Sequence, residues 1–178
     1  MADSRFDPVA LLKVLRGSRV RFVLIGGMAG STHGSATVTG DLDILFARDR
    51  DNLEALARAL KKLGAKPRGQ DHTLPFALDA QLLRNGTNFT WETRLGDLDT
   101  LGEVSGGFTF DRVAQGAVTY DFEGSKILVS SLDDLIGMKR AAGRPADLLE
   151  VERLSALSDV MTERRAVDDP RGLLLAAT

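Results

Sequence analysis

Hydrophobic and polar positions repeat with two different periods along the chain, and together they predict a mixture of strands and helices. The apolar run at residues 21–25 leads into Gly26-Gly27, which predicts a buried strand followed by a turn. Residues 41–46 begin with alternating polar and apolar positions and predict a second strand. Residues 51–63 carry apolar side chains at helical spacing and stop at Gly64, which predicts an amphipathic helix.

Capping and turn signals predict the remaining elements. Asp7-Pro8 marks the start of a helix that ends near Gly17, and a short helix is expected from Met28 to His33. The Ser130–Asp134 segment resembles a capping box that opens a helix to about Ala142, and Pro145 starts another. Loops are expected over 69–75 and 104–108, and strands over 87–93, 95–101, 117–122 and 126–129, the last two as a hairpin.

This order of elements predicts an α/β (α+β) fold, in which helices flank a mixed sheet and a pair of helices follows at the C-terminal end. A length of 178 residues suits one domain. We assign that domain to residues 1–162, with its C-terminal helical part at 130–162. The pattern does not decide whether the tail at 163–178 is ordered.

Composition narrows the chemistry and the location. The chain contains no cysteine, which excludes disulfides, Cys-ligated zinc and thiol catalysis. Its formal net charge is -2, so a polynucleotide partner would need a local basic patch. Residues 1–8 are polar, so no signal peptide is expected, and no apolar run is long enough for a membrane span. We therefore expect a cytoplasmic protein without a membrane partner.

The strongest chemical feature is the pair Asp41 and Asp43. Residues two apart in a strand project from the same face, so these carboxylates point together while Leu42 enters the core. Carboxylates this close repel each other unless a cation lies between them. Hard cations such as Mg²⁺ bind carboxylates together with substrate phosphates. The pair therefore indicates a metal that also binds a triphosphate.

Two further segments complete this pattern. The Gly26-Gly27 turn lets backbone amides approach phosphate oxygens, and Ser31 lies one helical turn beyond it. A third carboxylate for a two-metal site is offered by Asp97 or Asp99, only one of which needs to reach the metals. Taken singly, Asp-x-Asp is more often surface charge and Gly-Gly more often a simple turn, but their order and spacing here favour the metal site.

The sequence resembles the nucleotidyltransferases of the DNA polymerase β superfamily. The resemblance is strong in VLIGGMAGSTHGSATVTGDLDILF, and moderate in DLDTLGEV and in SLDDLIGMKRAAGRPADLLEVERL. Among small bacterial members it looks most similar to AbiEii-type and MenT-type toxins and related stand-alone enzymes. Relatives often carry Arg two residues before the Thr that precedes Asp-x-Asp, whereas this chain has Thr37 there.

This resemblance implies a polymerase-β-type fold and a metal-dependent transfer of a nucleotide from a nucleoside triphosphate (NTP). Asp41 and Asp43 would bridge two Mg²⁺ or Mn²⁺ ions, while Asp99 would bind the catalytic ion and help to deprotonate the acceptor. The residues implied to contact the phosphates are Gly26, Gly27, Ser31, Lys139 and Arg144.

The acceptor is left open. The resemblance favours RNA, in particular tRNA, with the chain acting as a toxin beside a cognate antitoxin. Transfer to a small molecule or to a protein hydroxyl are alternatives, as is a non-catalytic nucleotide-binding module, although the presence of all three acids argues against the last. A cluster of basic residues would suit RNA phosphates, but such clusters more often complement a helix end. Its members are Lys61, Lys62, Lys66 and Arg68.

Three aromatic or imidazole side chains have both structural and functional interpretations. Phe89 and Trp91 share one face of a predicted strand, which favours core packing over base stacking. His33 could approach the triphosphate or serve as a structural residue at a helix end, and the sequence does not favour either.

Overall fold

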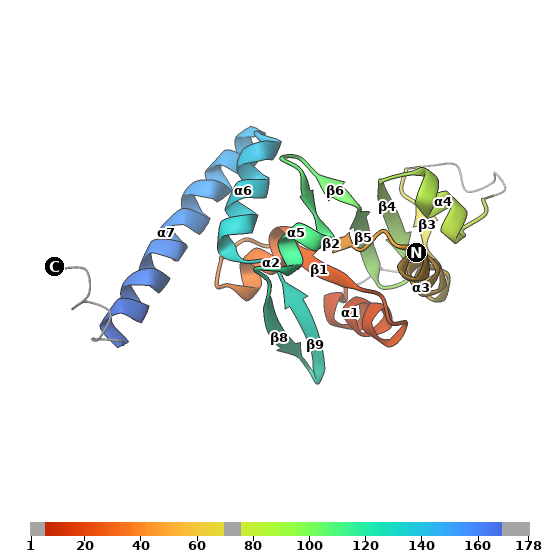
Figure 1. Cartoon of the computed structure of the whole chain (residues 1–178), viewed down its shortest axis with the longest axis horizontal. Coiled ribbons are helices and arrows are strands. Elements are labelled where there is room, and N and C mark those ends of the chain that lie inside the picture. Colours follow the sequence, from red (N-terminus) through yellow and green to blue (C-terminus); the bar gives the residue numbers. More distant parts are fainter. Residues whose placement is uncertain (1–5, 70–75, 169–178) are drawn as a thin grey trace.

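The computed structural model describes residues 6–69 and 76–168, and it contains strands and helices in mixed order (Figure 1). The strands are β1 (Phe22–Ile25), β2 (Asp41–Phe46), β3 (Lys66–Pro67), β4 (Asn88–Thr93), β5 (Gly96–Leu101), β6 (Glu103–Val104), β7 (Phe108–Thr109), β8 (Val118–Phe122) and β9 (Ser125–Val129). The helices are α1 (Pro8–Gly17), α2 (Gly26–Thr32), α3 (Arg50–Lys62), α4 (Ala80–Asn85), α5 (Phe110–Ala114), α6 (Leu132–Ala142) and α7 (Pro145–Asp168).

The main sheet is mixed and has seven strands in the order β3-β4-β5-β2-β1-β9-β8. The β2/β5 and β1/β9 pairs are parallel, and the other neighbours are antiparallel. Strands β6 and β7 form a separate two-stranded sheet. The sheet therefore places β2 at its centre, between β1, which leads into α2, and β5.

Alternation along β2 separates the core from the polar face of the sheet. Leu42 and Ile44 are fully buried, and they share the core with apolar side chains of α1 and α3. Asp41 and Asp43 project from the opposite face and are partly accessible. Helix α6 packs along α7, which extends away from the sheet (Figure 1). The predicted mixed sheet with flanking helices and a C-terminal helical pair is confirmed.

Local signals explain where the elements begin and turn. Asp7 accepts a hydrogen bond from the amide of Ala10 at 2.9 Å, and Ser131 accepts one from the amide of Asp134 at 3.1 Å. In the β8–β9 hairpin, Glu123 and Gly124 both have positive φ, of 50° and 86°. That combination defines the type I′ turn, which matches the twist of paired strands.

The structure differs from the sequence prediction in its shortest elements. Helix α2 begins at Gly26, two residues before the predicted start, because Gly26 turns the chain with a φ of +67° directly after β1. Helices α4 and α5 and strands β3, β6 and β7 were missed, since elements of two to six residues are too short to show a period. The loop expected over 104–108 joins β6 to β7.

Two predicted segments fall partly outside the structure. Of the loop at 69–75, residues 70–75 lie outside the described residues, as do residues 169–178 of the predicted tail. Helix α7 continues through residue 162 to Asp168, and the domain boundaries stay a prediction. No helix among the described residues is long and apolar enough to cross a membrane.

A buried amide side chain joins the start of β1 to the end of β2. Asn52 on α3 is 3% exposed, and its Oδ1 accepts a hydrogen bond from the amide of Arg21 at 2.7 Å. Its Nδ2 donates to the carbonyls of Arg21 and Ala47, at 3.0 and 2.7 Å. One side chain thus bonds to three backbone groups, of which the Arg21 carbonyl also accepts from the Ala47 amide at 3.1 Å.

We predict that Asn52→Ala lowers the free energy of unfolding by about 2–4 kcal/mol, because it leaves buried polar groups unsatisfied. Urea unfolding followed by circular dichroism measures the change. Asn85→Ala, at the exposed end of α4, is the matched control and should change stability by about 0.5 kcal/mol or less. Equal effects of the two substitutions would contradict the structural role of Asn52.

Candidate functional site

The register of β2 and β5 brings the predicted carboxylates together. Asp43 is the neighbour of Asp99 in this parallel pair, and Asp41 is the neighbour of Asp97. One carboxylate oxygen from each of Asp41, Asp43 and Asp99 lies within 4.8 Å of the others. Of the two acids on β5, it is therefore Asp99 that joins Asp41 and Asp43. Three carboxylates in this arrangement suit a hard divalent cation.

The turn after β1 lies directly against this group. Ile25 is the antiparallel partner of Asp43, so Gly26 follows at the point where the Asp43 side chain projects. A Cβ on Gly26 would lie 2.7 Å from Asp43 Cγ, and a Cβ on Gly27 would lie 2.8 Å from Thr39 Cβ. Side chains at these two positions would therefore clash, and the absence of one at Gly26 lets the backbone lie against the Asp43 carboxylate.

Two hydroxyl side chains hold the loop between α2 and β2. Thr39 Oγ1 donates to Asp41 Oδ1 at 2.8 Å, which fixes the orientation of that carboxylate. Ser31 Oγ is 2.8 Å from the carbonyl oxygen of Thr37 and 3.2 Å from that of Gly27. The Ser31 hydroxyl proton is thus engaged by the backbone, and its predicted contact with phosphate stays a prediction.

Burial and mutual repulsion set the protonation of the group. Desolvation, followed by the charges of Asp41 and Asp99, raises the pKa of Asp43 to about 7, while Lys139 and Arg68 act in the opposite direction. Burial likewise raises the pKa of Asp99 against the opposing effect of Arg68. Without a cation, the site holds a proton near neutral pH that an ordinary carboxyl would have lost.

Arg68 is the site residue that sequence reasoning placed elsewhere. It follows β3, and its guanidinium contacts Asp99 Oδ1 through Nη2 at 2.8 Å and Asp97 Oδ2 through Nε at 3.2 Å. In the sequence it was assigned to a basic cluster at the end of α3. Only the pairing of the short β3 with β4 brings it over β5, and a two-residue strand gives no periodic signal.

Two predicted cationic residues, Lys139 and Arg144, face the same site from the C-terminal helices. Together with Gly26 and Asp43 they line a cavity of about 150 Å³. Both bind Asp147, which is 3% exposed: Lys139 Nζ lies 3.1 Å from Oδ1, and Arg144 Nε lies 2.5 Å from Oδ2. The hydrogen bond from Arg144, supported by Lys139, lowers the pKa of Asp147 despite its burial.

The position where relatives often carry Arg takes part in a different contact here. Thr37 Oγ1 lies 2.8 Å from both carboxylate oxygens of Glu150 on α7, and Ser35 Oγ lies 3.1 Å from Oε1. Glu150 is 8% exposed, and Arg153 approaches its Oε2 at 3.8 Å. Thr37 therefore ties the loop before β2 to α7.

The histidine and the aromatic residues singled out in the sequence have structural contacts. His33 Nε2 lies 2.7 Å from the Ser130 carbonyl oxygen, and Nδ1 lies 3.2 Å from the Tyr120 hydroxyl. A carbonyl only accepts, so Nε2 carries the proton. Trp91 is 1% exposed and stacks on Phe89 with ring centroids 5.5 Å apart. The core-packing interpretation of these two rings is confirmed.

Comparison with known proteins relates this fold to nucleotidyltransferases. The lincosamide antibiotic adenylyltransferase LnuA, solved with lincomycin bound, is 16% identical, with 83% of this chain and 94% of LnuA covered and a TM-score of 0.55. ANT(2'')-Ia, in complex with adenylyl-2''-tobramycin, is 15% identical, with 89% and 98% covered and a TM-score of 0.51. The chain thus has the fold of nucleotidyltransferases.

A third solved structure has the same fold. It is an antigenic nucleotidyltransferase-like protein from Paracoccidioides brasiliensis, 16% identical, with 84% of this chain and 74% of that protein covered and a TM-score of 0.50. No protein-family model matches the sequence, and no curated protein matches it. The similarity to these proteins is therefore one of fold, and the sequence identities are too low to assign their activity to this chain.

We predict that Gly26→Ala weakens binding of a divalent cation by at least about tenfold, because the new Cβ displaces the Asp43 carboxylate and the backbone is strained at positive φ. Titration calorimetry with Mn²⁺ measures the affinity, and circular dichroism checks the fold. Gly17→Ala at the end of α1, where an added Cβ meets nothing within 4 Å, should bind as the unaltered protein does. Undiminished binding by Gly26→Ala would show that the turn does not constrain Asp43.

The raised pKa of Asp43 predicts an unusual pH dependence of stability. The pKa of Asp43 is about 7 in the folded chain and 3.8 for an ordinary aspartate, so at pH values between these two the folded chain holds the proton more tightly than the unfolded chain. Metal-free protein therefore gains stability as the pH falls through 7. From about pH 8 to about pH 5.5 we expect the unaltered protein to gain about 2 kcal/mol more than Asp43→Asn does. Urea unfolding in EDTA tests this, and identical pH responses would contradict it.

Proposed function

We propose that this chain is a metal-dependent nucleotidyltransferase that moves a nucleotide from an NTP to an acceptor hydroxyl. One observation carries the proposal: oxygens of Asp41, Asp43 and Asp99 gather within 4.8 Å of one another beside the Gly26 turn. The fold likeness to nucleotidyltransferases supports it, because in this chain the group lies on the main sheet of that shared fold. A structural role alone would not favour three partly buried carboxylates whose oxygens lie within 4.8 Å of one another.

The donor set fits Mg²⁺ or Mn²⁺. All three donors are carboxylates, the ligands that hard cations prefer, and their repulsion has no complete compensation within the protein. Asp41 and Asp43 would hold both ions, and Asp99 would hold the one beside the acceptor. When bound, the metal supplies charge neutralisation for the triphosphate and makes the acceptor hydroxyl easier to deprotonate.

The surrounding residues have complementary roles in the transfer. Gly26, Gly27 and Ser31 would bind phosphate on one side, and Lys139 and Arg144 would bind it on the other. Asp99 would accept the proton of the acceptor, and its ion pair with Arg68 at 2.8 Å favours the ionised form that this role needs. The acceptor oxygen forms a bond to the α-phosphorus, the bond to the β-phosphate oxygen breaks, and pyrophosphate leaves.

For the acceptor, the charges beside Asp99 favour a small molecule. Arg68 belonged to the cluster that would have held RNA phosphates, yet its guanidinium is committed to Asp97 and Asp99. LnuA and ANT(2'')-Ia, which share the fold, carry small antibiotics in their solved complexes. We therefore infer that the first acceptors to test are small molecules that bear hydroxyl groups.

RNA is the second candidate, and the sequence resemblance to toxin-type members favours it. Lys61, Lys62 and Lys66 are exposed, so part of the basic cluster is still accessible to phosphates. In this case the chain would act on tRNA as a toxin and would have a cognate antitoxin as partner. Transfer to a protein hydroxyl is covered by the same experiment.

The test supplies α-labelled ATP, GTP, CTP and UTP in turn, with Mg²⁺, to the purified protein. Each reaction contains total cellular RNA, a panel of hydroxyl-bearing antibiotics or no added acceptor. Label on a small molecule would support the first candidate, and label on RNA the second. Label on protein would identify a protein acceptor. EDTA should abolish every one of these signals.

We predict that Asp43→Asn lowers the transfer rate by at least about a thousandfold, since it removes a charge that would bind both metal ions. Asp159→Asn, an exposed carboxylate on α7, is the matched control and should keep full activity. Transfer that survives in Asp43→Asn would refute the metal assignment. If no acceptor is labelled, titration with Mg²⁺ and ATP will distinguish a nucleotide-binding module from a fold that does not bind NTP.

A further inference from the structure

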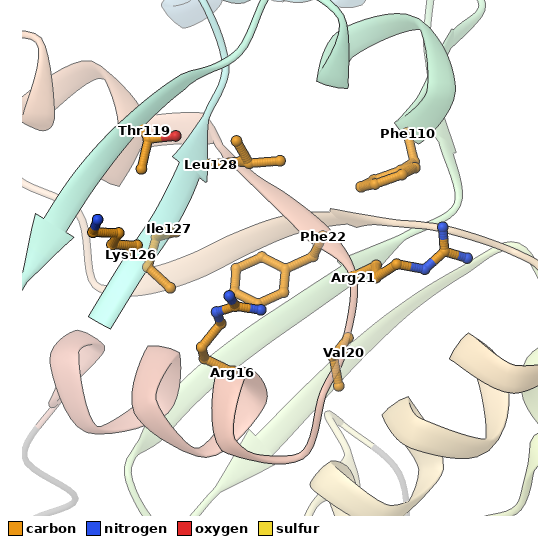
Figure 2. A pocket seen from close by; sticks show the side chains of 9 residues that line it. All are labelled: Arg16, Val20, Arg21, Phe22, Phe110, Thr119, Lys126, Ile127 and Leu128. Carbon is orange, nitrogen blue, oxygen red and sulfur yellow. The ribbon is translucent and has the colours of Figure 1, made fainter. Parts of the chain in front are cut away.

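A larger cavity lies at the other end of β1 from the carboxylates. Its volume is about 340 Å³, and Figure 2 shows its lining from α1, β1, α5, β8 and β9. Phe22, at the start of β1, lines this cavity, whereas Ile25, at the end, lines the one beside Asp43. Phe22 and Ile25 are three positions apart along the strand, a distance of about 10 Å. The two cavities share no lining residue.

The cavity exists because β1 and β9 separate toward their starts. This parallel pair has a single register position, Leu24 with Val129, followed by a hydrogen bond from the Ser130 amide to the Leu24 carbonyl at 3.0 Å. Before that point the strands diverge, as Figure 2 shows, and the sides of Phe22, Ile127 and Leu128 are left facing the gap. The cavity is therefore formed by the divergence of two sheet strands and not by the conformation of a surface loop.

Its chemistry combines an apolar base with a basic rim. Val20, Phe22 and Ile127 are each at most 5% exposed, and the Phe110 ring closes one side. Arg16, Arg21 and Lys126 surround this base, and no acidic residue of the described chain lines the cavity. The chain as a whole has a net charge of -2, so these three cations give the cavity a local excess of positive charge.

Two of these cations have no ion-pair partner among the described residues. Arg21 is committed, because it forms an ion pair with Asp49 and its guanidinium lies 5.8 Å from the Phe110 ring centroid. Arg16 and Lys126 form no such pair. The carboxylates near Lys126 have other partners, since Asp121 accepts from the Gly124 amide at 2.6 Å and Glu123 binds Lys13 at 2.7 Å.

We propose that this cavity binds a small organic anion: an apolar or aromatic body that bears one carboxylate, sulfonate or phosphate group. The body would lie against Phe22, Ile127 and Phe110, and the anionic group would meet Arg16 at the rim, while Lys126 adds positive charge from the outer side of β9. A volume of about 340 Å³ accommodates a ligand of roughly two fused rings and is too small for a polynucleotide. This inference is independent of the proposed nucleotidyl transfer.

The test uses 8-anilinonaphthalene-1-sulfonate, a fluorescent aromatic sulfonate, with the full-length folded protein. We expect one dye to bind per chain, and N-phenyl-1-naphthylamine, which has the same rings without the sulfonate, to bind at least about tenfold more weakly. Replacing both free cations, in Arg16→Gln with Lys126→Gln, should weaken dye binding by roughly tenfold. The matched control is Arg58→Gln with Lys61→Gln on α3, which removes the same charge elsewhere and should bind as before.

A second variant and a competitor locate the dye. Thr119→Trp adds bulk at an exposed position of the lining and should abolish binding without unfolding the chain, as circular dichroism will verify. Mg²⁺ with ATP should leave the bound dye in place. Displacement by ATP, equal affinity for the neutral dye, or unchanged binding in the double Gln variant would each overturn the proposal.

Discussion

Repulsion among Asp41, Asp43 and Asp99 is the constraint around which the polar half of this protein is organised. Isolated in water, three carboxylates would move apart, yet here their oxygens lie within 4.8 Å. The backbone prevents the separation, because Asp41 and Asp43 share a strand and Asp99 is the register neighbour of Asp43. Two of the side chains are also held locally, because Thr39 donates a hydrogen bond to Asp41 and the Gly26 backbone lies against Asp43. The repulsion can therefore be reduced only by binding a proton or a cation.

Positive charges are placed around this group without neutralising it. Arg68 pairs with Asp97 and Asp99 at the β3 side, and Lys139 lines the cavity on the α6 side. Lys139 is in turn shared with Asp147, as is Arg144. An anion that enters the cavity would therefore meet cations whose orientation Asp147 has already fixed, at the cost of competing with that carboxylate for them.

The sequence was informative where its signals are periodic or local. The alternation in 41–46 and the apolar run before Gly26 predicted β2, β1 and the turn, and Ser131 marked the start of α6. The neighbourhood of Arg68 could not be predicted, because it depends on a two-residue strand pairing with a distant one. The contact of Thr37 with Glu150 could not be predicted either, since Glu150 lies on α7, far along the chain.

The parallel pairing of β2 with β5 also determines when these charges first meet. Their connection includes α3, β3, α4 and β4, and β4 forms the antiparallel partner of β5 on its other side. Asp43 and Asp99 therefore stay apart in the unfolded chain and become neighbours only when the centre of the sheet closes. The electrostatic cost of bringing Asp99 to Asp41 and Asp43 therefore falls on the folded state alone. A divalent cation that binds there would bind only the folded chain. It would therefore stabilise the folded sheet against unfolding, in addition to its proposed role in nucleotidyl transfer.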